Sequence, residues 1–531
     1  MAMPRPRFAL AAYVVIVVGA TAVPYYLAWR ATPPDRVYTG AANSRSDDLA
    51  PYLARMRAGA RGEWTYRSQY APGMGSTLTI RPSYTILGAL TGITGAPFWV
   101  GYHAARLALG AVCLVVIFRV AGSVSRSGPE HWAAFVLATI GSGIGWLMGR
   151  SGDPASWSYD LSVSDLNVVH AITSTPHFTL GILLMLCCVA AVSRSIEHGR
   201  AGAAAWGGAA FGYLALEHTY GTVVLGGALA AYGLAAWAGA RASRGALLRS
   251  AIAFTAAASP AVAWQIASVL TDPSLAHTRL ARPIASLWSV ATGLGILLLL
   301  ALPGLPVLAR RSTLGRILVA WSLIVPLLLV LPLPFSRRLV IGWQVPLGVA
   351  AGIGLVRLLA AIRQPALRGA VAIAAIAFAS ASTVDVFAFD IRASLQPELG
   401  YRTWLPRQFV DTYGWLQSRA SPRSVVLGPY AFSNFLPVYT DLCVYFGHGG
   451  ETPDAAARRA GVEKFYDPET PDAWRSRFLI EEAIDWVIAP HEGASRTSAH
   501  VDPERVEGLA LAEHLGFIEI FKVQRDDRSP P

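Results

Sequence analysis

The stretch on which the interpretation of the chain depends runs from Asn43 to Tyr66 and reads NSRSDDLAPYLARMRAGARGEWTY. It follows an apolar segment that is long enough to cross a bilayer. Two adjacent carboxylates, Asp47 and Asp48, stand among arginines near its start. Adjacent acids repel each other, so an ordinary surface loop gains nothing from the pair. Two interpretations are open: a solvated loop carrying an amphipathic helix, or a catalytic base held at a membrane surface.

The composition is that of a membrane protein. The chain has 531 residues, of which 53% are hydrophobic and 15% charged, and its mean hydropathy is +0.42. Soluble domains carry about 25% charged residues. The net charge of +11 is spread over short loops between apolar runs, which excludes a groove for nucleic acid. The four cysteines show no spacing typical of a disulfide framework or a zinc site.

Eleven apolar segments are candidates for membrane spans, which need about 20 residues each. They lie at 8–29, 97–122, 131–149, 176–193, 203–217, 219–240, 250–270, 284–308, 316–333, 339–360 and 370–389. The first resembles a signal peptide, but it continues into an aromatic cluster of Tyr25, Tyr26 and Trp29. We therefore interpret it as a retained anchor.

The arginines of the short loops predict the orientation. Fourteen lie on one side, at Arg5, Arg7, Arg126, Arg194, Arg200, Arg241, Arg244, Arg249, Arg310, Arg311, Arg316, Arg357, Arg363 and Arg368. Five lie on the other side, at Arg150, Arg279, Arg282, Arg337 and Arg338. By the positive-inside rule the N-terminus is cytoplasmic. An odd number of spans then places both the Asp47–Asp48 loop and the C-terminal tail outside the cytoplasm.

The chain divides into two predicted domains. Residues 1–390 form a transmembrane bundle whose first outer loop, 30–96, carries two interfacial helices, LAPYLARMRAGA and RPSYTILGALTGI. Residues 391–531 form a soluble α/β domain. Its predicted strands are SVVLG, DLCVYFG, DWVIAP and FIEIFKV, and its predicted helices are PDAAARRAGVEKFY, PDAWRSRFLIEEA and DPERVEGLALAEHL. It has no glycine-rich phosphate loop, so we assign it no nucleotide.

Ionisable residues inside a membrane bundle are costly, and each is a functional candidate. Two short helices meeting at LEHTY would place Glu217 and His218 below the outer surface, although a buried structural pair is the alternative. His103 and Arg106 lie in the second predicted span. Arg119, near the inner face, is interpreted as a topology charge.

Two further motifs suit an anion. In STPHFTL, Pro176 fits a first helical turn, so His177 and unbonded N–H groups would stand at a helix N-terminus, or simply cap it. In LPFSRRLV, Arg337 and Arg338 oppose the topology rule and suit a phosphate held by two guanidinium groups. A carboxylate base and a phosphate site on the outer face indicate transfer of a group from a lipid-linked phosphate to a hydroxyl.

The loop DDLAPYLARMRAGARGEW resembles the first outer loop of the GT-C superfamily of membrane glycosyltransferases, which includes protein mannosyltransferases and aminoarabinose transferases. Asp48 stands four residues before Tyr52, with Gly59, Gly62 and Trp64 following, so it matches the family's base and Asp47 is an extra acid. The chain is more similar still to uncharacterised bacterial members with a short outer α/β domain, through YHAARLALG, GSGIGWL, STPHF and GHGGET.

The chain departs from the family at two points. His218-Thr219-Tyr220 stands where His-Pro-Tyr is expected, and the acid doublet leaves the position of the base open by one residue.

The resemblance implies a multi-pass protein of the bacterial plasma membrane that uses a polyprenyl-phosphate sugar. Arg337, Arg338, His218 and His177 would hold the donor phosphate while Asp48 deprotonates an acceptor hydroxyl, with inversion at the sugar. Asp160, Asp165 or Glu217 would position the acceptor or a divalent metal, Mg²⁺ or Mn²⁺; members differ in metal dependence, so no cofactor is assigned. His448 and Thr452 would contact an acceptor glycan or simply form a turn.

The acceptor is a glycan, a lipid or a protein, and no nucleic-acid partner is expected. A transporter or flippase of a lipid-linked glycan is the main alternative, but no internal repeat relates two halves of the chain. A polysaccharide polymerase or ligase with a lipid-pyrophosphate donor is the second alternative.

Overall fold

A computed structural model describes residues 6–42, 46–73, 81–151, 156–239, 243–271, 286–331, 335–396, 401–490 and 506–524. Arg5, Arg241, Arg279 and Arg282 of the orientation prediction lie outside these residues. The chain forms two compact units. The helical unit comprises Met1–Val23, Tyr102–Ala267 and Ala281–Ile391, and the mixed unit comprises Pro24–Gly101, Ser268–Leu280 and Arg392–Pro531.

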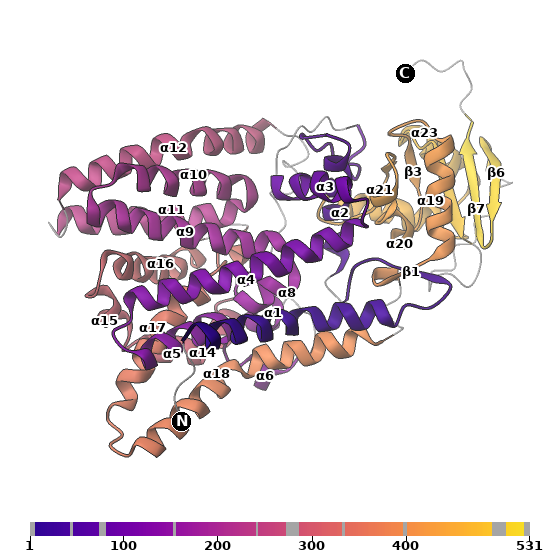
Figure 1. Ribbon diagram of the computed structural model, residues 1–531. Coiled ribbons are helices and arrows are strands. Elements are labelled where there is room, and N and C mark those ends of the chain that lie inside the picture. The colour runs from indigo at the N-terminus through magenta and orange to yellow at the C-terminus, as the bar shows by residue number, and fades with distance from the viewer. Residues whose placement is uncertain are drawn as a thin grey trace. The chain divides into compact units, whose positions relative to one another are not determined.

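The helical unit is built from helices (Figure 1). In chain order they are α1 (Pro6–Arg30), α4 (Phe98–Val124), α5 (Gly128–Ile140), α6 (Gly145–Met148), α7 (Tyr159–Ser162), α8 (Val168–Ser174), α9 (Pro176–His198), α10 (Ala201–Glu217), α11 (Thr219–Ala238), α12 (Arg244–Thr271), α14 (Leu287–Ala301), α15 (Leu305–Ala309), α16 (Thr313–Leu329), α17 (Gln344–Leu359) and α18 (Pro365–Ser394). A 3₁₀ turn, η4 (Ser336–Arg338), precedes α17. By residue number, the last residues of α1, α12 and α18 and the first residues of α4 belong to the mixed unit.

The helices make this a multi-pass membrane protein. Among the described helices six are long and apolar enough to span a bilayer, namely α1, α4, α9, α11, α12 and α18, and α14, α16 and α17 are shorter apolar helices. Each predicted span contains a helix. That the bilayer is also crossed by the five shorter ones stays a prediction: α5, α10, α14, α16 and α17. The predicted span 131–149 is too long, because α5 ends at Ile140 and the loop 141–144, which contains two glycines, follows it.

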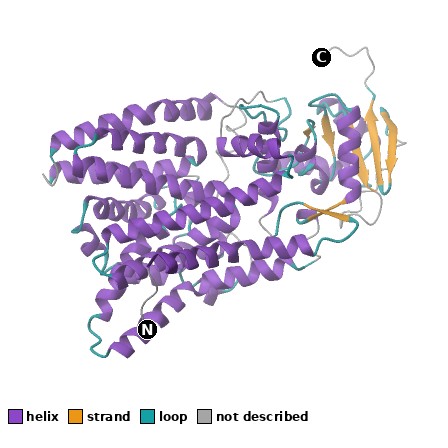
Figure 2. Cartoon of the chain, viewed as in Figure 1, coloured by secondary structure: helices purple, strands orange, loops and turns teal. Residues whose placement is uncertain are grey.

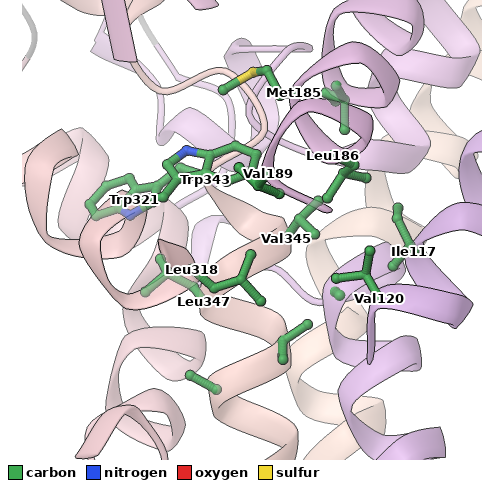
Figure 3. Close-up of a cluster of buried hydrophobic side chains, with 14 of the residues drawn as sticks. Ile117, Val120, Met185, Leu186, Val189, Leu318, Trp321, Trp343, Val345 and Leu347 are labelled. Atoms are coloured by element: carbon green, nitrogen blue, oxygen red, sulfur yellow. The ribbon is translucent and has the colours of Figure 1, made fainter. Parts of the chain in front are cut away.

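The core of the helical unit lies where α10 packs on α9 and α11, α11 on α16, and α17 on α5 and α14. Figure 3 shows part of this core, where Trp321 and Trp343 lie beside aliphatic side chains such as Val345, Leu318 and Leu347. Trp321 is completely buried, and the indole N–H of Trp343 donates to the carbonyl oxygen of Ser322 over 3.0 Å. The fit between these large side chains and the dispersion contacts that they make hold the helices together.

The mixed unit combines helices with two sheets (Figure 2). Its helices are η1 (Ser46–Asp48), α2 (Leu49–Ala60), α3 (Pro82–Thr94), α19 (Arg407–Arg419), α20 (Tyr430–Ser433), α21 (Leu436–Tyr439), α22 (Ala455–Phe465) and α23 (Asp472–Glu481). Its strands are β1 (Arg36–Tyr38), β2 (Trp404–Pro406), β3 (Val425–Leu427), β4 (Cys443–Val444), β5 (Trp486–Pro490), β6 (Leu509–Leu515) and β7 (Ile518–Val523).

The tail forms a five-stranded mixed sheet in the order β4-β3-β5-β7-β6. Strand β3 is parallel to β4 and β5, and β7 is antiparallel to β5 and β6. The predicted α/β character, including four strands and the helices at α22 and α23, is confirmed.

The helix predicted for DPERVEGLALAEHL is wrong over Leu509–Leu515, which is β6; residues 502–505 of that prediction lie outside the described part. The strand forms a hairpin with β7, and the two-residue turn between Leu515 and Ile518 begins at Gly516, whose φ is 64°. Glycine adopts this left-handed conformation without strain, and the ladder hydrogen bonds outweigh the helix propensity of leucine, alanine and glutamate.

The first loop belongs to the same compact unit as the tail. Strand β1 pairs with β2 in an antiparallel register that sets Val37 opposite Leu405. The predicted division into 1–390 and 391–531 did not include this pairing.

Both helices predicted in the first loop form, at α2 and α3. An amphipathic surface helix was expected at α2, but nearly all its residues are buried against α3 and α21. A Cβ added to Gly59 would meet the backbone of Thr85, so this glycine permits the close approach of the two helices.

We expect Trp321→Ala to lower the free energy of unfolding by about 3–5 kcal/mol, because the cavity left in a packed core forfeits the contacts of a whole indole. Thermal unfolding of the detergent-solubilised protein measures the loss. Trp206→Ala is the control, since Trp206 is 79% exposed, and it should leave the midpoint almost unchanged. An equal shift for both variants would contradict the packing described.

Candidate active site

The two acids of the first loop bind different partners. Asp48 occupies the N-cap position of α2, yet its side chain makes no capping hydrogen bond. Its Oδ1 lies 3.1 Å from Nε2 of His448 instead. The Asp48 side chain is 55% exposed whereas that of His448 is 10% exposed, so a buried imidazole holds a carboxylate that solvent and small molecules can reach.

The backbone around His448 defines the role of each ring nitrogen. In the neutral ring the N–H of Gly450 donates to Nδ1 over 3.2 Å, so Nδ1 is the acceptor of that form. A neutral imidazole that accepts at Nδ1 carries its proton on Nε2, which therefore donates to Asp48. The His448 N–H donates to the hydroxyl of Thr452, and the edge of Tyr70 packs against the ring. The loop GHGGET is thus a turn that aims Nε2 at Asp48.

Asp47 is held by a guanidinium group. Its Oδ1 lies 2.9 Å from Nε of Arg402, and its carbonyl oxygen accepts a hydrogen bond from the side chain of Asn434. Burial raises the pKa of Asp47, and the charge of Arg402 opposes this shift. Asp47 is therefore committed to an ion pair, which leaves Asp48 as the more exposed of the two acids.

A partly buried ion pair anchors the same turn to α2. Glu451 lies 2.9 Å from Arg55 of α2 and 3.8 Å from Arg81, which precedes α3. Burial raises the pKa of Glu451, but the two arginines outweigh it, and the net pKa lies below the usual value. The guanidinium of Arg55 also stacks over Tyr66, and that of Arg81 over Tyr52.

The helical unit contains a second group of charges, around Asp165. Its Oδ2 lies 3.7 Å from Arg338 of η4 and 3.8 Å from Nε2 of His218, and its side chain is completely buried. Burial raises the pKa of Asp165, and Arg338 opposes this shift. Arg337, from the same turn, donates to the carbonyl oxygen of Ser162 over 3.5 Å. One buried carboxylate thus faces Arg338 and His218, with Arg337 in the same turn as Arg338.

His218 forms the predicted break between two helices. It follows the last residue of α10 and is the N-cap of α11, where its Nδ1 accepts from the N–H of Gly221 over 3.2 Å. By the same reasoning as for His448, Nε2 carries the proton and faces Asp165. His177 lies at the start of α9, as predicted, and its ring stacks 6.1 Å from that of His218. Glu217 is buried at the end of α10.

Asp160 has a structural position. Its Oδ2 accepts from the N–H groups of Gly143 and Gly145, each over 3.1 Å, and its Oδ1 accepts from the Ser158 hydroxyl over 2.6 Å. These bonds hold the loop after α5, so Asp160 does not join the cluster of Asp165. Within the described ranges, no group of three His, Cys, Asp or Glu side chains could hold a metal. A metal at Asp160, Asp165 or Glu217 stays a prediction.

Two other intramembrane candidates pack the helices. Arg106 is completely buried and donates to the carbonyl oxygens of Ile172 and Thr21 over 2.9 and 3.3 Å. Its Nε also donates to Nδ1 of His103 over 3.2 Å. Arg106 thus bonds a carbonyl of α1 and a carbonyl in the last turn of α8, where the helix supplies no N–H partner.

Sequence reasoning missed Arg402, Arg55, Arg81 and Glu451 as parts of the site. Glu451 stands within GHGGET, so the motif contained one signal. The arginines resemble the many others of the first loop and the tail, and only long-range pairing distinguishes them.

No family model and no curated protein matches the chain. Solved structures of GT-C glycosyltransferases do match its fold. The apo oligosaccharyltransferase of Archaeoglobus fulgidus is 11% identical, with 91% of this chain and 69% of that chain covered and a TM-score of 0.60. ArnT from Cupriavidus metallidurans bound to undecaprenyl phosphate is 13% identical, with 96% and 98% covered and a TM-score of 0.52.

The arabinofuranosyltransferase AftD from Mycobacteria is 18% identical, with 97% of this chain and 40% of that chain covered and a TM-score of 0.56. Another structure of the archaeal enzyme, AglB, holds an inhibitory peptide and a dolichol-phosphate. The chain therefore has the GT-C fold that its first loop predicted.

We expect Glu451→Gln to destabilise the protein by about 3 kcal/mol, because it leaves two guanidinium groups without their buried counter-charge. Thermal or denaturant unfolding measures the change. Glu463→Gln is the matched control: its pair with Arg459 is exposed on both sides and should contribute less than about 0.5 kcal/mol. A neutral result for Glu451→Gln would show that the pair does not anchor the turn.

The pH dependence of the free energy of unfolding should reveal the stabilising charge of His448. Burial opposes its charge, but the hydrogen bond and charge of Asp48 outweigh burial and raise its pKa above 6.5. The stabilisation is therefore fully present below pH 6.5 and is lost as the pH rises through the higher pKa of the folded chain.

His448→Gln retains a hydrogen-bond donor but cannot become charged, so its deficit in melting temperature should shrink as the pH rises. His198→Gln, at the exposed end of α9, is the control. A deficit that stays constant with pH would exclude the charged pair.

Proposed function

We propose that the chain is a membrane glycosyltransferase that moves a sugar from a polyprenyl-phosphate donor to an acceptor hydroxyl outside the cytoplasm, with inversion. The observation that carries this proposal is the hydrogen bond from buried His448 to half-exposed Asp48. The GT-C fold supports it, since the similar structures include an oligosaccharyltransferase, ArnT bound to undecaprenyl phosphate and an arabinofuranosyltransferase.

Asp48 is the general base of this reaction. A base must be ionised and within reach of the hydroxyl that it deprotonates. Asp47 is bound to Arg402, whereas Asp48 is exposed and oriented through one oxygen by His448. His448 is a positioning residue, because it acts on the acceptor through Asp48.

The donor phosphate binds to the cationic side chains of the helical unit. Arg337, Arg338 and the Nε2–H of His218 face one buried carboxylate, Asp165, so the group retains positive charge for an anion. His177 supplies a further imidazole at the start of α9. Undecaprenyl phosphate and dolichol-phosphate, which similar structures hold, are ligands of the expected class.

The reaction forms one bond and breaks one. The acceptor hydroxyl loses its proton to Asp48, its oxygen attacks the anomeric carbon, and the bond from that carbon to the phosphate oxygen breaks. The polyprenyl phosphate leaves with the bonding electron pair, and Arg337, Arg338 and His218 offset its growing charge. The mixed unit and the N-terminus lie outside and inside the cytoplasm, respectively, in this proposal.

Sugar release from a panel of polyprenyl-phosphate sugars by the purified protein tests the function. Asp48→Asn should lower turnover by about 10²–10⁴-fold, because the amide cannot accept the proton, while lipid-phosphate binding stays intact. Asp47→Asn, the matched control at the adjacent acid, should retain most of the turnover.

Other outcomes have definite meanings. Equal turnover by the parent and Asp48→Asn would remove Asp48 as the base. Tight binding of the lipid phosphate with no turnover by the parent would refute the transferase and favour a transporter. Binding that survives Arg338→Gln unchanged would place the donor phosphate elsewhere.

A further inference from the structure

The mixed unit contains a pocket of about 640 Å³ at the C-terminal end of α2. Its walls come from the segment after α2 and from the tail, and they include Arg61, Trp64, Arg67, Arg423 and Asp441. We propose that this pocket binds an acidic saccharide, a remote part of the acceptor glycan. The proposal rests on the proposed function, which it deepens by naming the class of acceptor.

Trp64 supplies an aromatic platform. Its side chain is 62% exposed, which is costly for an indole that faces water. A lipid-facing position does not explain this exposure, because Glu63, Thr65 and Arg67 around it are exposed and polar. The apolar C–H face of a sugar ring covers an indole while its hydroxyl groups stay in contact with polar neighbours.

The charges of the pocket select an anion. The acids are already neutralised: Asp441 pairs with Arg57 and Arg61, and Glu63 pairs with Arg61. Arg67 and Arg423 are exposed, and within the described part of the chain neither forms an ion pair. Two guanidinium groups thus remain for a carboxylate or a phosphate, which they bind with paired hydrogen bonds.

The backbone at the pocket is strained. Arg423 has a φ of 66°, a conformation that costs about 1–3 kcal/mol for a residue other than glycine. Its N–H donates to the carbonyl oxygen of Asp441 over 3.0 Å, which fixes the turn. A turn that glycine or asparagine would form more easily instead presents an arginine to the pocket.

The pocket lies too far from Asp48 to hold the acceptor hydroxyl that reacts. Asp48 precedes α2 and Arg61 follows it, so about 18 Å of helix separates them at 1.5 Å per residue. A glycan that reaches Asp48 with one hydroxyl therefore places a sugar several units away in the pocket. The acceptor is accordingly an acidic oligosaccharide.

Binding of the labelled full-length protein in detergent to a glycan array tests this inference. The array carries oligosaccharides with uronic acids, oligosaccharides with phosphate groups and their neutral counterparts. Acidic glycans should bind and neutral ones should not, binding should weaken with salt, and the two acidic classes identify the anion.

Variants connect that binding to the pocket. Trp64→Ala and Arg423→Asn should each weaken it by roughly tenfold or more. Asparagine tolerates the left-handed backbone, so its effect reports the lost charge. Arg459→Gln, at an exposed arginine outside the pocket, should leave it unchanged.

Asp48→Asn separates the two proposals, since it should bind the glycan normally and lack turnover. Glycan binding without turnover in the parent would contradict only the transferase. Turnover with equal binding of neutral and acidic glycans, or binding unaffected by Trp64→Ala and Arg423→Asn, would overturn the pocket.

Discussion

The arrangement of the turn 448–452 depends on one carboxylate, Glu451, whose side chain is only 18% exposed. Glu451 cannot remain charged in the interior without counter-charges, and Arg55 of α2 and Arg81 before α3 supply them. This pairing fixes the position of the turn 448–452 relative to α2 and to Arg81. His448 stands three residues before Glu451 in that turn, so the position of its ring on Asp48 follows from the same contact. A charge with no part in the proposed proton transfer therefore sets the geometry of Asp48, the proposed base.

Two histidines of the chain use the same local device with different results. In each, Nδ1 accepts a backbone N–H and Nε2 faces a carboxylate: Asp48 for His448, and Asp165 for His218. The acids differ in exposure, at 55% and 0% of the side chain. An exposed acid with an oriented oxygen suits proton transfer. The buried acid, Asp165, acts as a counter-ion, which makes it less costly to place Arg338 and His218 close together.

Local patterns predicted most of the helices and several residues of the candidate site. Apolar runs located the helices, and LEHTY located the break at His218, because two adjacent ionisable residues between two short apolar runs mark the point where one helix ends and the next begins. The strand β6 was missed because its residues favour a helix and only its pairing with β7 decides otherwise. Arg402 and Glu451 were missed for a related reason: their partners lie hundreds of residues away, and nothing in the local sequence marks such pairs.

The pairing of β1 with β2 has a consequence for how such proteins exchange parts. Residues 36–38 and 404–406 form one small sheet although a whole helical bundle separates them in the chain. The part that could be exchanged as a unit, the first loop together with the tail, is therefore discontinuous in the chain. A chimera joined near residue 390 would divide it. A tail transplanted onto a related bundle would need its own first loop, with α2 and α3, to travel with it. Natural recombination at a single junction should be rare in this architecture, and matching changes in the two segments should evolve together.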